Sequence, residues 1–279
     1  MAHADPPPDA IPEPGDPAGE AIPRLLDLYA PQLFALATRL CGSRDEGEDL
    51  VQEIFLRAFD GWGGFEGRAS PKTWLYTIAA NACQRMHRKR SGEPDHIGSL
   101  QELLPFGEPL IAVISSEQEP SDQIQIRAEA LRRVEDEIAS LPDEFRMPLI
   151  LKEIVGFSVP EIAAILGLAE GTARSRVHRA RLKLRSAVDR ALPRSPDLAP
   201  PPAYPQQTCL DLLDAKQEAL DRGVPFASDV ICERCRSVFA SMDLTHEVCR
   251  NLAGTDLPEG LRGRLREEIA ARSGGKHDA

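Results

Sequence analysis

Large apolar residues recur along the chain at the spacing expected for helices. Between Ile22 and Arg90 they lie mostly three to five positions apart, first as Leu25, Leu28, Leu33, Leu36 and Leu40, then as Leu50, Val51, Ile54, Phe55 and Phe59. The spacing returns at Leu131, Val134, Ile138 and Leu141 and continues to about Leu192. No convincing run alternates apolar and polar residues as a half-buried strand does. The pattern predicts an all-α fold.

Stretches rich in proline and polar residues divide these helical segments. Few large apolar residues occur in the acidic N-terminal stretch, which predicts disorder there, and a proline-rich spacer is expected to be fairly stiff. The predicted organisation is a tail (1–20), a helical domain (21–92), a linker (93–120), a second helical domain (121–192), a proline-rich linker (193–207), a small cysteine-rich helical domain (208–272) and a tail (273–279).

Charge is distributed unevenly. The chain carries a formal net charge of −11, yet "EGTARSRVHRARLKLR" (170–185) holds six Lys or Arg residues and one Glu. On a helix, the apolar residues of this stretch form one stripe and both remaining faces are basic. Such a helix fits the DNA major groove, where arginine pairs with guanine edges or phosphate. The predicted DNA-contacting residues are Thr172, Arg174, Ser175, Arg176, His178, Arg179 and Arg181.

The residues before the basic stretch supply a partner helix. In "SVPEIAAILG", Ser158 and Glu161 have the spacing of a capping box, and Gly167 suits a left-handed C-terminal cap. A short turn then leads into the basic helix, which makes a helix-turn-helix. The alternative is a solvated amphipathic helix that touches a membrane or another protein, and the capped partner favours DNA.

These motifs resemble those of the extracytoplasmic-function (ECF) sigma factors of bacterial RNA polymerase. "SLPDEFRMPLILKEIVGFSVPEIAAILGLAEGTARSRVHRARLKLR" is similar to their region 4, which recognises the −35 promoter element. "RLCGSRDEGEDLVQEIFLRAF" and "FEGRASPKTWLYTIAANACQRMHRKR" are similar to parts of region 2. One departure is Ala169, which stands where many relatives carry a capping Ser.

The resemblance implies roles for residues of region 2. Asp49, Gln52 and Glu53 match the segment that docks on the β′ subunit of core polymerase, although an acidic stripe can also be a plain solvated face. The part that melts and recognises the −10 element is matched by Lys72, Trp74, Asn81, Arg85 and Arg88. Trp74 is equally well explained as a core residue.

Four cysteines gather near the C-terminus. Cys232 and Cys235 have CxxC spacing, and His246 and Cys249 follow, with Cys209 upstream. Paired thiolates with an imidazole suit zinc, cadmium or copper(I). Cys235 and Cys249 lie about 21 Å apart on an unbroken helix. A shared site therefore requires a break near Met242 and Asp243, which we predict.

Three interpretations of this C-terminal segment stay open: metal binding at Cys209, Cys232, Cys235, His246 and Cys249, a thiol–disulfide sensor, or a metal-free packing domain. It resembles the cysteine-rich domain of CorE-like metal-responsive sigma factors, but lacks a further Cys-x-Cys near its end. That departure weakens the case for copper.

The resulting expectation is a sigma factor and not an enzyme. The N-terminus does not resemble a signal peptide and no apolar run approaches the ~20 residues of a membrane span, which predicts a cytoplasmic protein. The expected partners are core polymerase (β′ and β) and promoter DNA, with no membrane partner and no cofactor required for the core function. The C-terminal domain is expected to act as an intramolecular regulator. The alternative is a stand-alone helix-turn-helix regulator.

Overall fold

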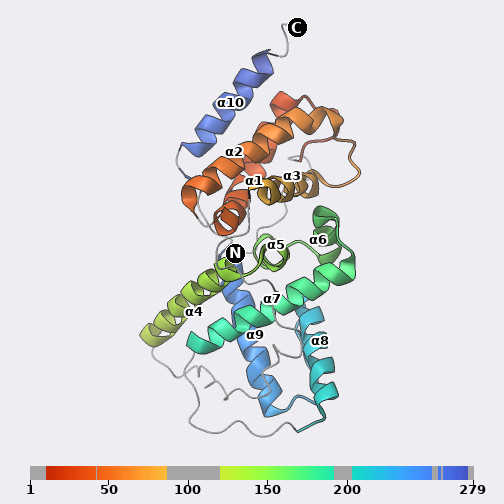
Figure 1. The fold of residues 1–279 in the computed structure, drawn as a ribbon, viewed down its shortest axis with the longest axis vertical. Coiled ribbons are helices and arrows are strands. Elements are labelled where there is room, and N and C mark those ends of the chain that lie inside the picture. Colours follow the sequence, from red (N-terminus) through yellow and green to blue (C-terminus); the bar gives the residue numbers. More distant parts are fainter. Residues whose placement is uncertain are drawn as a thin grey trace. The chain divides into compact units, whose positions relative to one another are not determined.

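The computed structural model describes residues 11–41, 43–86, 120–191, 203–252, 257–258 and 260–275. Throughout these residues the secondary structure is helical and contains no strand (Figure 1), which confirms the all-α prediction. None of the described helices is long and apolar enough to span a bilayer. Arg88, the first ten residues and most of both predicted linkers lie outside the described residues.

The helices fall into two compact units. The first contains α1 (Ala18–Cys41), α2 (Arg44–Gly61), η2 (Trp62–Gly64), α3 (Pro71–Met86) and α10 (Leu261–Gly275), together with the short stretch 164–167. The second contains α4 (Pro120–Ser140), α5 (Asp143–Ile150), η3 (Leu151–Val155), the rest of α6 (Val159–Leu166), α7 (Glu170–Ala191), α8 (Gln206–Arg222) and α9 (Glu233–Asn251).

The first unit is built on the apolar positions that the sequence pattern singled out. Leu25, Leu33, Leu36, Leu50 and Ile54 are all fully buried, since they occupy the inward faces of α1 and α2. The Ser43 hydroxyl accepts a hydrogen bond from the Glu46 backbone N–H and so caps the start of α2. After the end of α2, the rings of Trp62, Phe65 and Trp74 pack together in an aromatic cluster.

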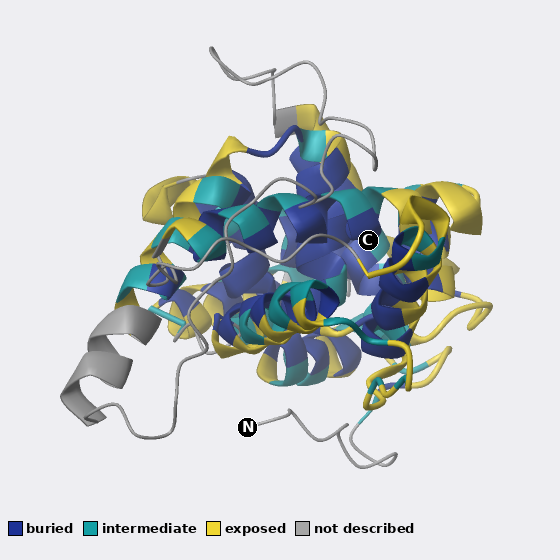
Figure 2. Cartoon of the chain, turned by 90° about the horizontal axis from the view of Figure 1, so that it is seen from below, coloured by how far each residue is buried: buried dark blue, intermediate teal, exposed yellow. Residues whose placement is uncertain are grey.

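The second unit is arranged around α7. Its apolar residues Ala173, Val177, Ala180 and Leu184 are fully buried, as the sequence predicted. Within both units the helices carry buried residues on one side and exposed residues on the other (Figure 2). This is expected for amphipathic helices, whose apolar side packs against the core.

The C-terminal segment that the sequence assigned to one domain is divided between the units. Its α8 and α9 belong to the second unit, and its α10 to the first. The predicted break near Met242 and Asp243 is wrong, because α9 runs without interruption through both residues. Met242 is fully buried in an apolar cluster, and the Asp243 carboxylate accepts a hydrogen bond from Lys216 at 2.5 Å instead of capping a second helix.

Candidate nucleic-acid interface and cysteine cluster

The local geometry that precedes α7 is that of a capped helix and a tight turn. The backbone N–H of Ser158 donates to the Glu161 carboxylate at 2.8 Å, and the Glu161 N–H donates back to the Ser158 hydroxyl at 3.4 Å. This is the predicted capping box. Gly167 has φ +64°, a conformation that favours glycine, and Leu168 N–H bonds the Ala163 carbonyl at 2.9 Å.

The N-terminal half of α7 presents basic and hydroxyl groups to solvent. Thr172, Arg174 and Ser175 are exposed. Arg176 is half-buried and pairs with Glu144 at 2.7 Å, and the Arg179 guanidinium lies over the Phe145 ring at 4.8 Å. These five residues are the part of the predicted DNA-contacting set that keeps solvent access.

Two further residues of that set, His178 and Arg181, face other protein groups. Arg181 is 1 % exposed, and its guanidinium donates to Glu153 at 2.5 and 3.0 Å, to Asp221 at 2.9 Å and to the Gln217 side chain at 2.9 Å. The His178 ring lies 2.9 Å from the second Asp221 oxygen. In the structure these side chains join α7 to α8 and η3.

The carboxylates of this network are held in the ionised form. Burial acts to raise the pKa of Glu153, but the Arg181 charge and the His246 hydrogen bond outweigh it and lower the pKa to about 2. Burial likewise acts to raise the pKa of Asp221, and the hydrogen bond with His178 and the charge of Arg181 lower it to about 2.

The sequence pattern did not identify Glu153, Gln217 and Asp221 as site residues. One signal was available for Glu153, since it is a carboxylate within the apolar run "LILKEIVGF". Gln217 and Asp221 lie on an amphipathic helix with other polar residues, so nothing distinguished them.

The predicted metal ligands do not converge. His246 Nδ1 lies 2.5 Å from Glu153, so this ring belongs to the Arg181 network. Cys249 lies 14 residues after Cys235 on the same unbroken helix, a rise of about 21 Å. Among the described residues there is no group of three or more His, Cys, Asp or Glu side chains placed to hold a metal ion. The five residues therefore do not form the single site that the sequence suggested.

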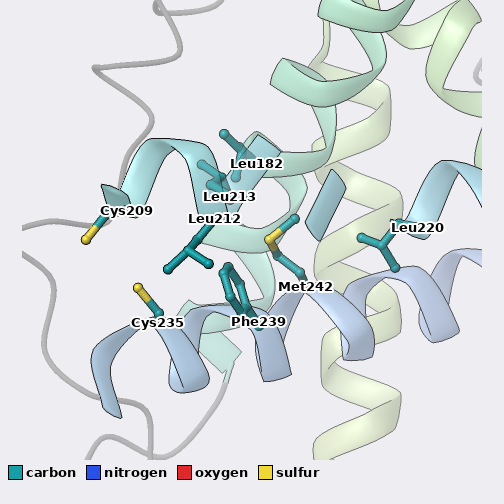
Figure 3. Close-up of a cluster of buried hydrophobic side chains, with 8 residues drawn as sticks. All are labelled: Leu182, Cys209, Leu212, Leu213, Leu220, Cys235, Phe239 and Met242. Atoms are coloured by element: carbon teal, nitrogen blue, oxygen red, sulfur yellow. The ribbon is translucent and has the colours of Figure 1, made fainter. Parts of the chain in front are cut away.

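Three of the cysteines do gather. Cys209 and Cys235 lie at one end of a buried cluster (Figure 3), and Cys232 packs against it at the N-cap of α9. Burial raises the pKa of Cys235, the neighbouring Cys232 and Cys209 add to it, and the value reaches about 12. Burial also acts to raise the pKa of Cys232, but hydrogen bonds from Cys235 and from backbone groups lower it overall.

The described residues that were predicted to dock on polymerase or to melt the −10 element lie in the first unit. Asp49 is exposed, Glu53 pairs with Arg57 at 2.6 Å, and Gln52 donates to Glu268 of α10 at 2.7 Å. Asn81 and Arg85 are exposed and Lys72 is half-buried. Trp74, also half-buried, packs against Trp62 and Phe65 with ring centroids 5.5 and 5.2 Å apart, so it contributes to the aromatic cluster.

Comparison with known proteins matches two family models, Sigma-70 region 2 over residues 25–93 and Sigma-70 region 4 over residues 131–184. The chain is 30% identical over 169 residues to the ECF RNA polymerase sigma factor SigW of Bacillus subtilis, covering 61% of this chain and 89% of that protein. It is 32% identical over 164 residues to the RNA polymerase sigma-H factor of Pseudomonas aeruginosa, covering 59% and 82%.

A solved structure also matches. It is the sigma factor RpoE in complex with the anti-sigma factor NepR from Bartonella quintana, at 30% identity and a TM-score of 0.43, and it covers 59% of this chain and 94% of that chain. The region 4 match ends at residue 184, before α8 and α9. The resemblance of the C-terminal segment to a CorE-like domain stays a prediction.

Proposed function

We propose, because the chain belongs to the ECF family of RNA polymerase sigma factors, that it binds core RNA polymerase and directs initiation at specific promoters. The second unit recognises the −35 element with the N-terminal half of α7. The observation that carries this part is the solvent-facing set that follows a capped helix: Thr172, Arg174, Ser175, Arg176 and Arg179. We assign His178 and Arg181 to the attachment of α8, since the His178 Nε2 atom lies against Asp221 and the Arg181 guanidinium donates to Gln217.

The first unit supplies the remaining contacts of the proposal. Asp49, Gln52 and Glu53 dock on polymerase. Lys72, Asn81 and Arg85, with Arg88 beyond the described residues, contact the −10 element. Trp74 is half-buried, which is compatible with stacking on an unpaired base from its position in the aromatic cluster. No chemistry on a substrate is involved, and the proposed place of action is the cytoplasm, where polymerase and chromosome are found.

Run-off transcription with purified core polymerase tests this function. Wild-type protein is expected to direct transcription from its promoter, and Arg174→Ala to weaken it while reducing the salt slope of DNA binding by about 0.9 per lost phosphate contact. Arg236→Ala, an exposed arginine on α9, is the matched control and is expected to behave as wild type. Binding of duplex DNA without any binding of polymerase would favour a stand-alone regulator instead.

We also propose that α8 and α9 respond to a signal through Cys209, Cys232 and Cys235, the three cysteines that lie together. The signal is either oxidation, in which two thiols give two electrons and two protons to a peroxide and form a disulfide while the peroxide is reduced to water, or binding of a thiophilic ion such as Zn²⁺, Cd²⁺ or Cu⁺. Ion binding requires the three side chains to rearrange, because in the structure they are not placed to hold a metal ion. Thiol titration with and without a chelator separates the two forms. Zinc released with three thiols supports the metal, and a diamide-induced disulfide that changes transcription supports oxidation.

A further inference from the structure

The last helix, α10, docks on the first unit through a narrow apolar stripe. Leu261, Leu265 and Ile269 are spaced four residues apart, and each is 1 % exposed. They pack where α10 runs beside α1 and α2 (Figure 1). The approach to α1 is close, because a Cβ added at Gly19 would lie 2.9 Å from the Ser273 hydroxyl oxygen. The helix is therefore seated on a fitted surface.

Arginines flank this stripe and meet carboxylates of α1 and α2. Arg264 pairs with Glu48 at 2.6 Å, and Arg266 donates to both oxygens of Asp27 at 2.6 and 2.7 Å. Farther along, Arg272 pairs with Asp60 at 3.1 Å. The α1–α2 surface is thus acidic around an apolar centre, and it is complementary to a basic amphipathic helix.

This surface overlaps the segment that we assign to polymerase docking. The Gln52 side-chain amide donates to Glu268 of α10 at 2.7 Å, and Glu48, one turn before Gln52, is held by Arg264. Asp49 is exposed, and Glu53 pairs with Arg57 of the same helix at 2.6 Å. A partner that binds the whole segment must displace Glu268 from Gln52.

We propose that α10 competes with core polymerase for the α1–α2 surface, so that the chain covers its own docking segment until the helix is released. The competition rests on the proposed polymerase-binding function. The segment that covers this surface is α10 of the same chain, and its arginines pair with Glu48, Asp27 and Asp60. The arginines of α10 keep contact with water, with Arg264 60 % exposed on its side chain, so the helix leaves without stranding a buried charge.

The test measures the affinity of the full-length protein for purified core polymerase. Leu265→Asp places a carboxylate in the apolar stripe, and the double substitution Arg264→Glu with Arg266→Glu sets like charges against Glu48 and Asp27. Both variants are expected to bind polymerase at least tenfold more tightly than wild type. The matched control is Ala270→Asp, which adds the same carboxylate on the exposed side of α10 and is expected to leave the affinity unchanged.

Hydrogen exchange of α10 in the same samples reports whether the helix has been released. Released α10 with an unchanged or weaker polymerase affinity would overturn the competition and leave the sigma-factor function standing. If neither the wild type nor any variant binds polymerase, the proposed function itself fails. If one substitution does not release α10, the other decides, since one acts on the stripe and the other on the charges.

Discussion

The C-terminal segment is attached to the rest of the chain in two places of opposite character. In the second unit, α8 and α9 meet α7 and η3 through charges withdrawn from water. Asp221 of α8 pairs with Arg181 of α7, and their side chains are 10 % and 1 % exposed, while His246 of α9 lies against Glu153 of η3, whose side chain is 2 % exposed. In the first unit, α10 meets α1 and α2 through charges that stay in water, since Arg266 and Asp27 are 52 % and 40 % exposed. The same pairing of arginine with carboxylate therefore occurs in two different environments.

The difference decides how each attachment responds to perturbation. A buried pair that loses one partner leaves an uncompensated charge, at a cost of about 3–5 kcal/mol. An exposed pair contributes about 0–1 kcal/mol, because water replaces the lost partner. We infer that α8 and α9 are part of the fold of the second unit, and that α10 is held mainly by Leu261, Leu265 and Ile269 and is exchangeable.

The largest effect is expected from Glu153→Gln. The amide keeps the shape but removes the charge that faces Arg181 and His246. The second unit should lose about 3–5 kcal/mol of unfolding free energy, measured by urea-dependent hydrogen exchange of α7. Both tryptophans of the chain, Trp62 and Trp74, lie in the first unit, so the midpoint of their fluorescence transition should stay unchanged.

Glu144→Gln is the matched control for this variant. It removes the carboxylate that pairs with Arg176, but Glu144 is 45 % exposed on its side chain, so the loss should stay below about 1 kcal/mol. Equal losses for the two variants would show that burial does not distinguish these pairs and would remove the basis of the comparison.

Acid should weaken the second unit. The folded pKa of Glu153 lies near 2, below its ordinary value of 4.5, so its stabilisation is fully present above about pH 4.5 and is lost as the pH falls toward 2. The shift corresponds to a contribution on the order of 3 kcal/mol, and Asp221 titrates in nearly the same window. Urea midpoints of the second unit at a series of pH values check this, and Glu153→Gln should flatten the profile.

The features that could be predicted from the sequence are those that depend on residues close together in the chain. The capping box at Ser158 and Glu161, the left-handed Gly167 and the buried stripe through Val177 follow from spacing along one helix or turn, and all three are present. Local propensity and amphipathic period dictate such features wherever the chain is placed.

Features that depend on partners far away in the sequence could not be predicted. His178 and Arg181 lie on a basic helix face, which favoured DNA binding in the sequence analysis. Their partner Asp221 comes about forty residues later, on a helix whose other polar residues gave no reason to single it out. The break in α9 was inferred from the chemistry of the cysteines. The structure shows α9 as one continuous helix instead. Burial of the Met242 side chain stabilises this continuous conformation.

A smaller effect is expected when the apolar stripe of α10 is shortened. Leu265→Ala should cost at most about 2 kcal/mol, because the cost cannot exceed the free energy that holds α10 in place, and beyond that point the helix detaches. Faster hydrogen exchange of α10 with an unchanged tryptophan transition would show this. Leu182→Ala, the same deletion in the cluster beside α8 and α9, should destabilise the whole second unit by about 2–5 kcal/mol.

The smallest effect is expected from Arg264→Ala, which removes one exposed ion pair with Glu48. It should weaken the protection of α10 by less than about 1 kcal/mol. The difference from wild type should shrink further between about 50 and 500 mM salt, since screening shortens the reach of exposed charges to a few ångströms. Protection of α7 should hardly change over the same range, because the ion pair of Arg181 with Glu153 is shielded from the ions. If salt instead loosened α7 as much as α10, the charges at Arg181 would have to be open to solvent, and the two attachments would be alike in kind.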